Sequence, residues 1–454
     1  MVLVALAVAL QGCTVPAKTA SRVKPIDVED EVLASSAQPA AKSPPSAATR
    51  AKSSQPVVAR GMGEGTDIRA TVASALRHSG VLRRAQADRS SAEVEVKIAY
   101  GGYQPQLQSQ AGFGTSDTYD YGITVAQPLY DWGRTGADVE RAKANLASAQ
   151  ASFMDSAEKT ALEAVAAHIA VRRSEELVEA AQENLVAHRR FTELATDRTS
   201  GGVGDATEVE LAGVHQGEAE SALEDAKGAL RNAYSVYYSR VGREAARLAP
   251  VPELPLFLGE DKNLEAVALN APAVLAARAR QEAARHAAKM ERAGLLPRLS
   301  AEAFVRGDDD SDDAQTGVGL RIVGPSLAGL SNFSRVEAAN LQADSARWAA
   351  EAARRDATLQ ARELFDHEPT LRGRITILGA QLVRARALRD LYEDQFEIGE
   401  RSLADLVNVQ ADVFRIERSL INARYDIIDL QYQAAAALGY LIDALQVDLK
   451  GRGE

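Results

Sequence analysis

The chain has 454 residues, of which 46% are hydrophobic but only 5% are aromatic, and its net charge is −11. So small an aromatic share argues against a large aromatic-rich globular core, and the abundant alanine favours closely packed helices. The acidic balance, with no dense group of Lys and Arg free of interleaved acids, argues against a nucleic-acid-binding protein.

The N-terminal stretch MVLVALAVALQGC is an apolar run that ends at the only cysteine, Cys13. It is too short to span a bilayer but suits a secretory signal. Leu10-Gln11-Gly12-Cys13 resembles a bacterial lipoprotein cleavage site, so residues 1–13 are predicted to be a signal peptide with Cys13 as the lipidated residue. An ordinary cleaved signal is the alternative. No other segment reaches the roughly 18 apolar residues of an inner-membrane helix.

Residues 14–65 are rich in Pro, Ala, Ser and Lys and are predicted to form a flexible tether. The remainder divides into two similar halves, residues 66–255 and 256–445, followed by a C-terminal tail, 446–454. The turn GGVGDATEVELAG in the first half has a counterpart, EIGERSLADLVNVQAD, in which Gly399 follows Gly202 by 197 residues (399 − 202). Gln127-Pro128 and Gly324-Pro325 recur at the same spacing, which indicates an internal duplication.

Each half is predicted to contain a helix, a β-hairpin and a long helical hairpin. The β-hairpins cover residues 105–130 and 297–325, where apolar residues alternate with polar or very small ones at the length that a membrane strand needs. A soluble four-stranded sheet with one wet face is the alternative. Four strands cannot close a barrel alone, so membrane insertion would require several chains to share one barrel.

The helical hairpins are predicted at residues 134–245 and 333–445. The first contains no proline from Arg134 to Arg198, and such a helix is about 100 Å long. In the second, Pro369 is expected to kink or locally break the helix. The returning segments show heptad repeats of small and apolar residues, with the strongest a and d positions at Leu406, Val409, Val413, Ile416, Leu420, Ala423, Ile427 and Leu430.

Together these features resemble the TolC family of outer-membrane channel proteins. The resemblance is carried by AQPLYDWGR at residues 126–134 and by the second turn, which contains Phe396, Gly399, Arg401, Asp405 and Asn408. It implies a homotrimer in which twelve strands form one outer-membrane barrel and coiled-coil helices form a tunnel across the periplasm. The fold class is therefore mainly α with a membrane β part, located in the bacterial outer membrane and extending into the periplasm.

The resemblance also implies that the two turns form a gate at the periplasmic tip. Gly202 and Gly399 would end the descending helices in left-handed conformation. Arg401 would reach Thr207 and Glu208 of a neighbouring helix pair, and Asp405 would contribute to a ring of three carboxylates. Two departures from the family pattern suggest a weaker latch: Phe396 lacks the hydroxyl of the usual tyrosine, and Asn408 replaces an aspartate. The alternative is that these charged residues only cap helices.

Other chemistry is scarce in this sequence, and no enzyme, cofactor or metal site is predicted. No nucleophile elbow, phosphate loop or catalytic carboxylate pair is present. The histidines lack metal-ligand spacing and are predicted at the surface: His78, His168, His188, His215, His286 and His367. A solvated loop is expected at an acidic run that could alternatively bind cations: Asp308, Asp309, Asp310, Asp312 and Asp313.

The resemblance implies a passive exit duct of a type I secretion system, with a periplasmic adaptor, an inner-membrane ABC transporter and outer-membrane lipid as partners. The pattern that begins at Tyr392 and the turn GGVGDATEVELAG favour this branch. The alternative is the outer-membrane channel of a tripartite drug or metal efflux pump, driven by an RND transporter. A lipid-anchored periplasmic scaffold is a third possibility, against which the alternating segments argue.

Overall fold

A computed structural model describes residues 66–113, 119–245, 247–254, 264–308, 314–325 and 331–448, all within one compact unit, Val58–Glu454. Cys13, the predicted signal and tether, the acidic residues 309–313 and residues 449–454 of the tail lie outside the described residues.

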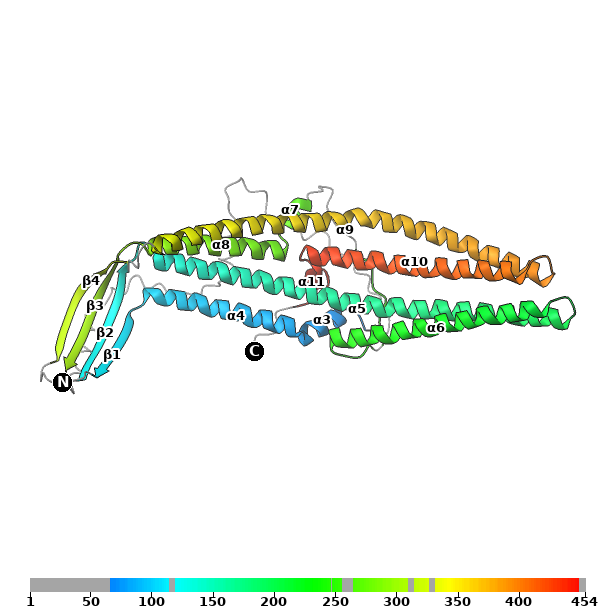
Figure 1. The fold of residues 1–454 in the computed structure, drawn as a ribbon, viewed down its shortest axis with the longest axis horizontal. Helices are drawn as coiled ribbons and strands as arrows, with labels where there is room; N and C mark the ends of the chain where they lie inside the picture. The colour runs from blue at the N-terminus through cyan, green and yellow to red at the C-terminus, as the bar shows by residue number, and fades with distance from the viewer. Residues whose placement is uncertain are drawn as a thin grey trace. The chain divides into compact units, whose positions relative to one another are not determined.

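The two halves have the same order of elements (Figure 1). The first half contains α3 (Ile68–His78), α4 (Gly80–Tyr100), η2 (Gly101–Tyr103), β1 (Gln106–Phe113), β2 (Tyr119–Tyr130), α5 (Arg134–Ser200) and α6 (Ala206–Val241). The second half contains α7 (Leu264–Ala268), α8 (Pro272–Ala293), β3 (Arg298–Asp308), β4 (Gln315–Val323), α9 (Ser331–Glu397), α10 (Leu403–Ala437) and α11 (Leu441–Ala444). Figure 1 shows the strands at one end of the long helices and the α5–α6 and α9–α10 turns at the other.

The descending helices α5 and α9 each have 67 residues, and α9 runs through Pro369 without interruption. The expected local break at this proline is therefore wrong. Packing explains the continuity, because Leu371, two residues further on, is buried against Ile427 and Leu430 of α10. The cost of the missing backbone hydrogen bond is offset by contacts that a sequence pattern does not reveal.

The heptad seam of α10 is buried as predicted. Leu406, Val413, Leu420 and Ile427 are at most 4% exposed, which places the a positions against neighbouring helices. In α6, alanines recur every seven residues, at positions 212, 219, 226 and 233, and are small enough to let α5 approach closely. Ala219 packs with Ala181 and Leu185 of α5.

The four strands form one antiparallel sheet in the order β1-β2-β3-β4. The two hairpins meet at β2 and β3, where Ile123 pairs with Val305. Several large apolar side chains on this sheet are strongly exposed, among them Ile123 at 49% and Val318 at 86%. Such a surface is unfavourable in water, so lipid or another chain is expected to cover it.

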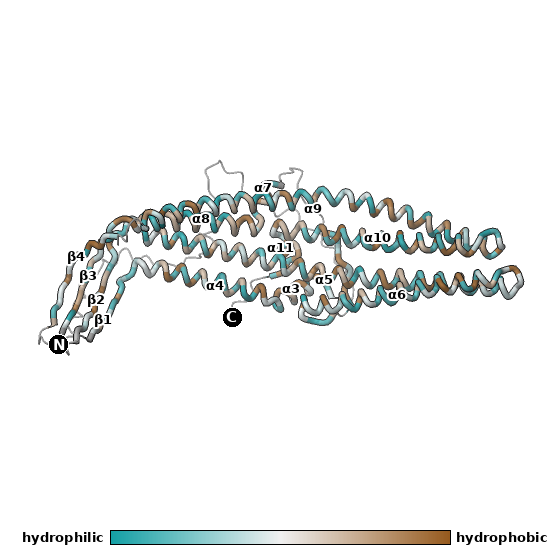
Figure 2. Tube along the Cα trace, in the orientation of Figure 1, coloured by the Kyte–Doolittle hydropathy of each residue, from teal (hydrophilic) through white to brown (hydrophobic). Residues whose placement is uncertain are grey.

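No helix among the described residues is both long enough and apolar enough to cross a membrane. Figure 2 shows hydrophobic and hydrophilic residues alternating along the helices.

The main core lies around the middle of α5, where α3, α11 and the ends of α6 and α10 converge. The C-terminal helix α11 is fixed there by Glu158, whose carboxylate accepts hydrogen bonds from the backbone N–H groups of Leu441 (3.1 Å) and Ile442 (3.4 Å). Glu158 is only 2% exposed. Burial raises the pKa of its carboxyl to about 7, and the nearby Asp443 and Asp155 act in the same direction.

The surface position predicted for two histidines is wrong. His168 is completely buried, since Thr71 Oγ1 lies 3.1 Å from its Nδ1 and the Ala249 carbonyl lies 2.9 Å from its Nε2. Burial lowers the pKa of His168. His188 is also buried, at 6% exposure. Tertiary partners that supply hydrogen bonds or aromatic contacts make these positions favourable.

Candidate functional site

The two turns at the end opposite the strands share one hydrophobic cluster. We call it the tip cluster, and it joins residues from all four long helices: Phe191, Ala195, Ala212, Phe396, Leu403, Leu406 and Val407. Phe396 is fully buried in it. The cluster therefore holds the α5–α6 hairpin and the α9–α10 hairpin side by side at their ends (Figure 1).

Glycine determines how each descending helix ends. Gly202 and Gly399 have φ angles of 77° and 82°, in the left-handed region that the sequence predicted for them. In the first turn the backbone N–H groups of Val203 and Gly204 both donate to the Arg198 carbonyl, at 3.0 Å. In the second, the Glu400 N–H donates to the carbonyl five residues earlier at 2.8 Å.

The returning helices begin at capping side chains. Asp205 accepts a hydrogen bond from the Thr207 backbone N–H at 3.2 Å, and Ser402 accepts one from the Asp405 N–H at 3.2 Å. The Ser402 hydroxyl also donates to the Asp405 carboxylate at 2.9 Å. Within one chain Asp405 therefore takes part in a helix cap. Asn408, one turn further along α10, is exposed to solvent.

Arg401 folds back onto its own hairpin. Its guanidinium lies 4.5 Å from the centre of the Tyr392 ring, and its Nε donates to Gln395 Oε1 at 3.1 Å. Both partners belong to α9. Among the described residues of a single chain, the expected contact of Arg401 with Thr207 and Glu208 is therefore not made.

Arg198 occupies the place at Glu208 that the sequence assigned to Arg401. Its guanidinium lies over the Phe396 ring, 4.3 Å from the ring centre, and its Nη1 is 3.8 Å from Glu208 Oε2. This residue was missed because its counterpart 197 residues later is Gln395, so the duplication draws no attention to it. A basic residue in the last turn of a helix, just before a left-handed glycine, was the available signal.

Further polar contacts join the two hairpins near the tip. Arg190 of α5 pairs with Glu393 and, at 3.4 Å, with Glu397 of α9. Deeper inside, the Gln410 amide donates to Asn184 Oδ1 at 2.8 Å, and both side chains are buried. The exposed pairs contribute little to stability, whereas the buried amide pair fixes the register of α10 against α5.

His188 lies beside the tip cluster, between the Phe191 ring and the ring of His215, whose centre is 6.2 Å away. Burial lowers the pKa of His188 to about 4, and the nearby His215 adds to this effect. His188 is therefore neutral at physiological pH, and it packs as an aromatic side chain.

Lowering the pH from 7 towards 4 is expected to destabilise the protein through His188. The unfolded chain binds this proton at a pKa near 6.5, the folded chain only at about 4, so stability falls across that window by up to about 3 kcal/mol. The check is the thermal unfolding midpoint at pH 7.5 and 4.5 for the wild type and for His188→Phe. A pH dependence that is unchanged in the variant would contradict this origin.

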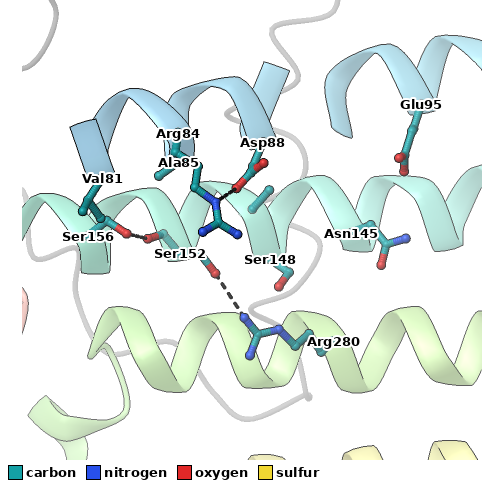
Figure 3. Close-up of a pocket in the computed structure, with 11 residues that line it drawn as sticks. Val81, Arg84, Ala85, Asp88, Glu95, Asn145, Ser148, Ser152, Ser156 and Arg280 are labelled. Atoms are coloured by element: carbon teal, nitrogen blue, oxygen red, sulfur yellow. Dashed lines mark hydrogen bonds and ion pairs between the residues drawn. The ribbon is translucent and has the colours of Figure 1, made fainter. Parts of the chain in front are cut away.

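A groove of about 510 Å³ lies on the strand side of the molecule, over α5 and between α4 and α8 (Figure 3). Among its charged side chains, Arg84 pairs with Asp88 at 3.8 Å, and Arg280 donates to Ser152 Oγ at 3.2 Å. These groups do not form a nucleophile with a base. Among the residues that the structure describes, no group of three or more His, Cys, Asp or Glu side chains is arranged to hold a metal ion.

Comparisons with known proteins agree with this architecture. A family model described as Outer membrane efflux protein matches residues 71–239 and 263–440. The outer membrane efflux protein BepC of Brucella suis biovar 1 is 23% identical over 382 residues, which cover 80% of this chain and 83% of BepC. The outer membrane protein TolC of Vibrio cholerae serotype O1 is 23% identical over 393 residues, which cover 80% of this chain and 88% of that protein.

Among solved structures, the outer-membrane channel OprN superposes with a TM-score of 0.74 at 19% identity, covering 82% of this chain and 89% of OprN. The superposition supports the same fold, with its two helical hairpins and its four-stranded sheet. Since the family model matches both halves of the chain, this protein belongs to the outer membrane efflux protein family, the family of TolC, and is an outer-membrane protein.

Proposed function

We propose that the protein is the outer-membrane exit duct of a type I secretion system and passively conducts a polypeptide from an ABC transporter and its adaptor to the exterior. Three chains share one barrel, and the paired helical hairpins form the tunnel below it in the periplasm. The energy comes from the inner-membrane transporter, and the duct carries out no chemistry on the cargo.

The four-stranded sheet is the main structural support for a barrel shared by three chains. β1 and β4 each have one side that pairs with no other strand among the described residues. An open strand edge cannot be left in lipid, because its backbone groups would be unpaired. Pairing β1 of one protomer with β4 of the next closes the sheet and places the exposed apolar face, including Val318 and Leu320, against lipid.

The two turns are proposed to be the gate. They are the ends of the helical hairpins that lie farthest from the strands (Figure 1), and the tip cluster keeps them together. In the trimer, Arg401 is proposed to leave its stacked position and reach Thr207 and Glu208 of a neighbouring protomer. Three copies of Asp405 then surround the entrance and favour cations.

Two classes of cargo are considered, a secreted polypeptide and small molecules such as drugs or metal ions. The turn sequences favour a secreted polypeptide. The second candidate, a tripartite drug or metal efflux pump driven by an RND transporter, is favoured by the family description and by the relative named efflux protein BepC. The helical duct suits both classes equally well, so the two candidates have to be separated by what cells without the protein fail to secrete or fail to resist.

Deletion of the gene in its own host tests the proposal. The expected result is the loss of one or more polypeptides from the culture medium, with unchanged susceptibility to drugs and metal ions, and recovery when the wild-type gene is returned. Increased drug or metal susceptibility with an unchanged set of secreted polypeptides would assign the chain to the efflux candidate instead.

A further inference from the structure

The polar contacts at the tip do not all join the two hairpins. Arg401 lies on Tyr392, and both belong to the second hairpin. Arg198 makes the same type of contact with Phe396, but it reaches from α5 across to α9. Of these two stacked arginines, only Arg198 connects one hairpin to the other.

Its backbone is held firmly. The Arg198 carbonyl accepts two of the turn's backbone hydrogen bonds, from Val203 and Gly204. The turn also packs tightly here, since a Cβ at Gly204 would lie 2.9 Å from the Thr199 backbone nitrogen. The backbone of Arg198 is therefore fixed within the first turn. Whether its side chain contacts Phe396 depends on how the two hairpins are placed against each other.

The guanidinium is largely shielded from water. The Arg198 side chain is 15% exposed and Phe396 is fully buried, a setting in which the attraction of a cation to an aromatic face is stronger than at an exposed site. The contact between the two hairpins at Phe396 is therefore formed by a ring face and a cation.

The contact contains no directional hydrogen bond. Among the described residues, Arg198 Nε and Nη1 and Glu208 Oε2 have no hydrogen-bond partner, and the 3.8 Å between Nη1 and Oε2 is too long for a hydrogen bond. The guanidinium is held by the ring and by the charge of Glu208. It can withdraw without breaking a directional bond, and on reaching water it recovers the hydration that it lost on burial.

We propose that Arg198 is the latch that holds the α9–α10 turn against the α5–α6 turn within each protomer. Opening of the tip then requires the guanidinium to leave the Phe396 ring. Arg198 is a positioning residue that acts through Phe396, and the inference rests on the proposed function of the two turns as a gate. Arg190 joins the same two helices, but its side chain is 58% exposed, so it is the matched control.

The test measures the distance between spin labels on the two turns of the full-length protein. The labels are placed at Val203→Cys and Ile398→Cys, whose native side chains are 73% and 71% exposed, in a Cys13→Ser background. Labelled chains are diluted with unlabelled chains, so that each trimer carries at most one labelled protomer. The variants are Arg198→Ala, Arg198→Lys and, as control, Arg190→Ala.

The expected result is one narrow distance distribution for the wild type and for Arg190→Ala. Arg198→Ala should give a broader distribution with a longer mean, and so should Arg198→Lys, because lysine keeps the charge but lacks the flat surface that lies on the ring. A wild-type distribution in Arg198→Ala, or equal broadening in Arg190→Ala, would overturn the latch.

Ion conductance of the same variants in planar bilayers separates this inference from the proposed function. A wider turn distance together with a higher conductance in Arg198→Ala supports both. A wider distance with wild-type conductance supports the latch and contradicts the turns as the gate.

Discussion

Replacement of Phe396 by alanine is expected to release the tip and to produce a channel with increased conductance. The phenylalanine ring is fully buried in the tip cluster and also carries the Arg198 guanidinium. Truncation of a buried phenylalanine typically costs about 3–5 kcal/mol. The packing contacts that are lost join the two hairpins near their ends. The substitution should therefore destabilise the tip more than the heptad seams.

Hydrogen exchange of the turn amides measures this local loss directly. In Phe396→Ala the amides of both turns should exchange much faster, while those in the middle of α5 and α10 keep their protection. Ile398→Ala is the control, since this side chain lies two residues away in the same turn and is 71% exposed. Uniformly faster exchange along both hairpins would show that the cluster stabilises the whole bundle and not the tip.

Replacement of Glu158 by glutamine is expected to remove a loss of stability that the wild type undergoes between pH 5 and pH 8. The carboxyl of Glu158 has a pKa of about 7 in the folded chain against 4.5 in its ordinary state. The contribution of Glu158 to the free energy of unfolding is fully present below pH 4.5 and is lost as the pH rises through 7. The total loss is up to about 3 kcal/mol. Glutamine carries no charge that burial penalises, but its single amide oxygen can accept from only one of the Leu441 and Ile442 N–H groups, which in the wild type donate to different carboxylate oxygens.

The thermal unfolding midpoint at pH 5 and pH 8 tests this. The stability of Glu158→Gln relative to the wild type should increase from pH 5 to pH 8, because the lost acceptor oxygen costs the variant at both pH values, whereas only the wild type becomes charged as the pH rises. Glu158→Ala is the control for the hydrogen bonds, because it leaves the two N–H groups without their acceptor and should be less stable at both pH values. An unchanged stability difference between Glu158→Gln and the wild type at the two pH values would contradict the raised pKa of Glu158.

Glu158 and His188 act in opposite directions across almost the same pH range. Between about pH 4.5 and 6.5 the contribution of Glu158 falls with rising pH, whereas that of His188 rises. The two opposite changes in stability with pH therefore largely cancel in the wild type. The pH dependence of the His188→Phe and Glu158→Gln variants should differ in sign, and this opposition is not visible in the wild-type curve alone.

Much of the fold could be predicted from local patterns. Two descending helices of equal length, the heptad positions of α10 and the left-handed glycines 202 and 399 follow from residue spacing, because helix period and backbone sterics are local properties. The four strands lie within the two predicted hairpin ranges for the same reason.

The remaining features depend on contacts between distant segments. The continuity of α9 at Pro369 follows from the packing of Leu371 against α10. Burial of His168 depends on Thr71 and on a carbonyl 81 residues away. Arg198 and Phe396 come from different halves of the chain, and nothing in either local sequence indicates that they meet. Sequence spacing could identify the two turns, but not the side chains that join them.

Single-channel conductance in planar bilayers tests the central claim, a trimeric duct gated at its helical tip, most directly. The wild type should show a small, cation-selective conductance. Arg401→Ala should raise it by loosening the proposed contacts between protomers, and Asp405→Ala should reduce cation selectivity by removing the proposed ring of carboxylates. The absence of any conductance from folded, detergent-extracted trimers would contradict the duct.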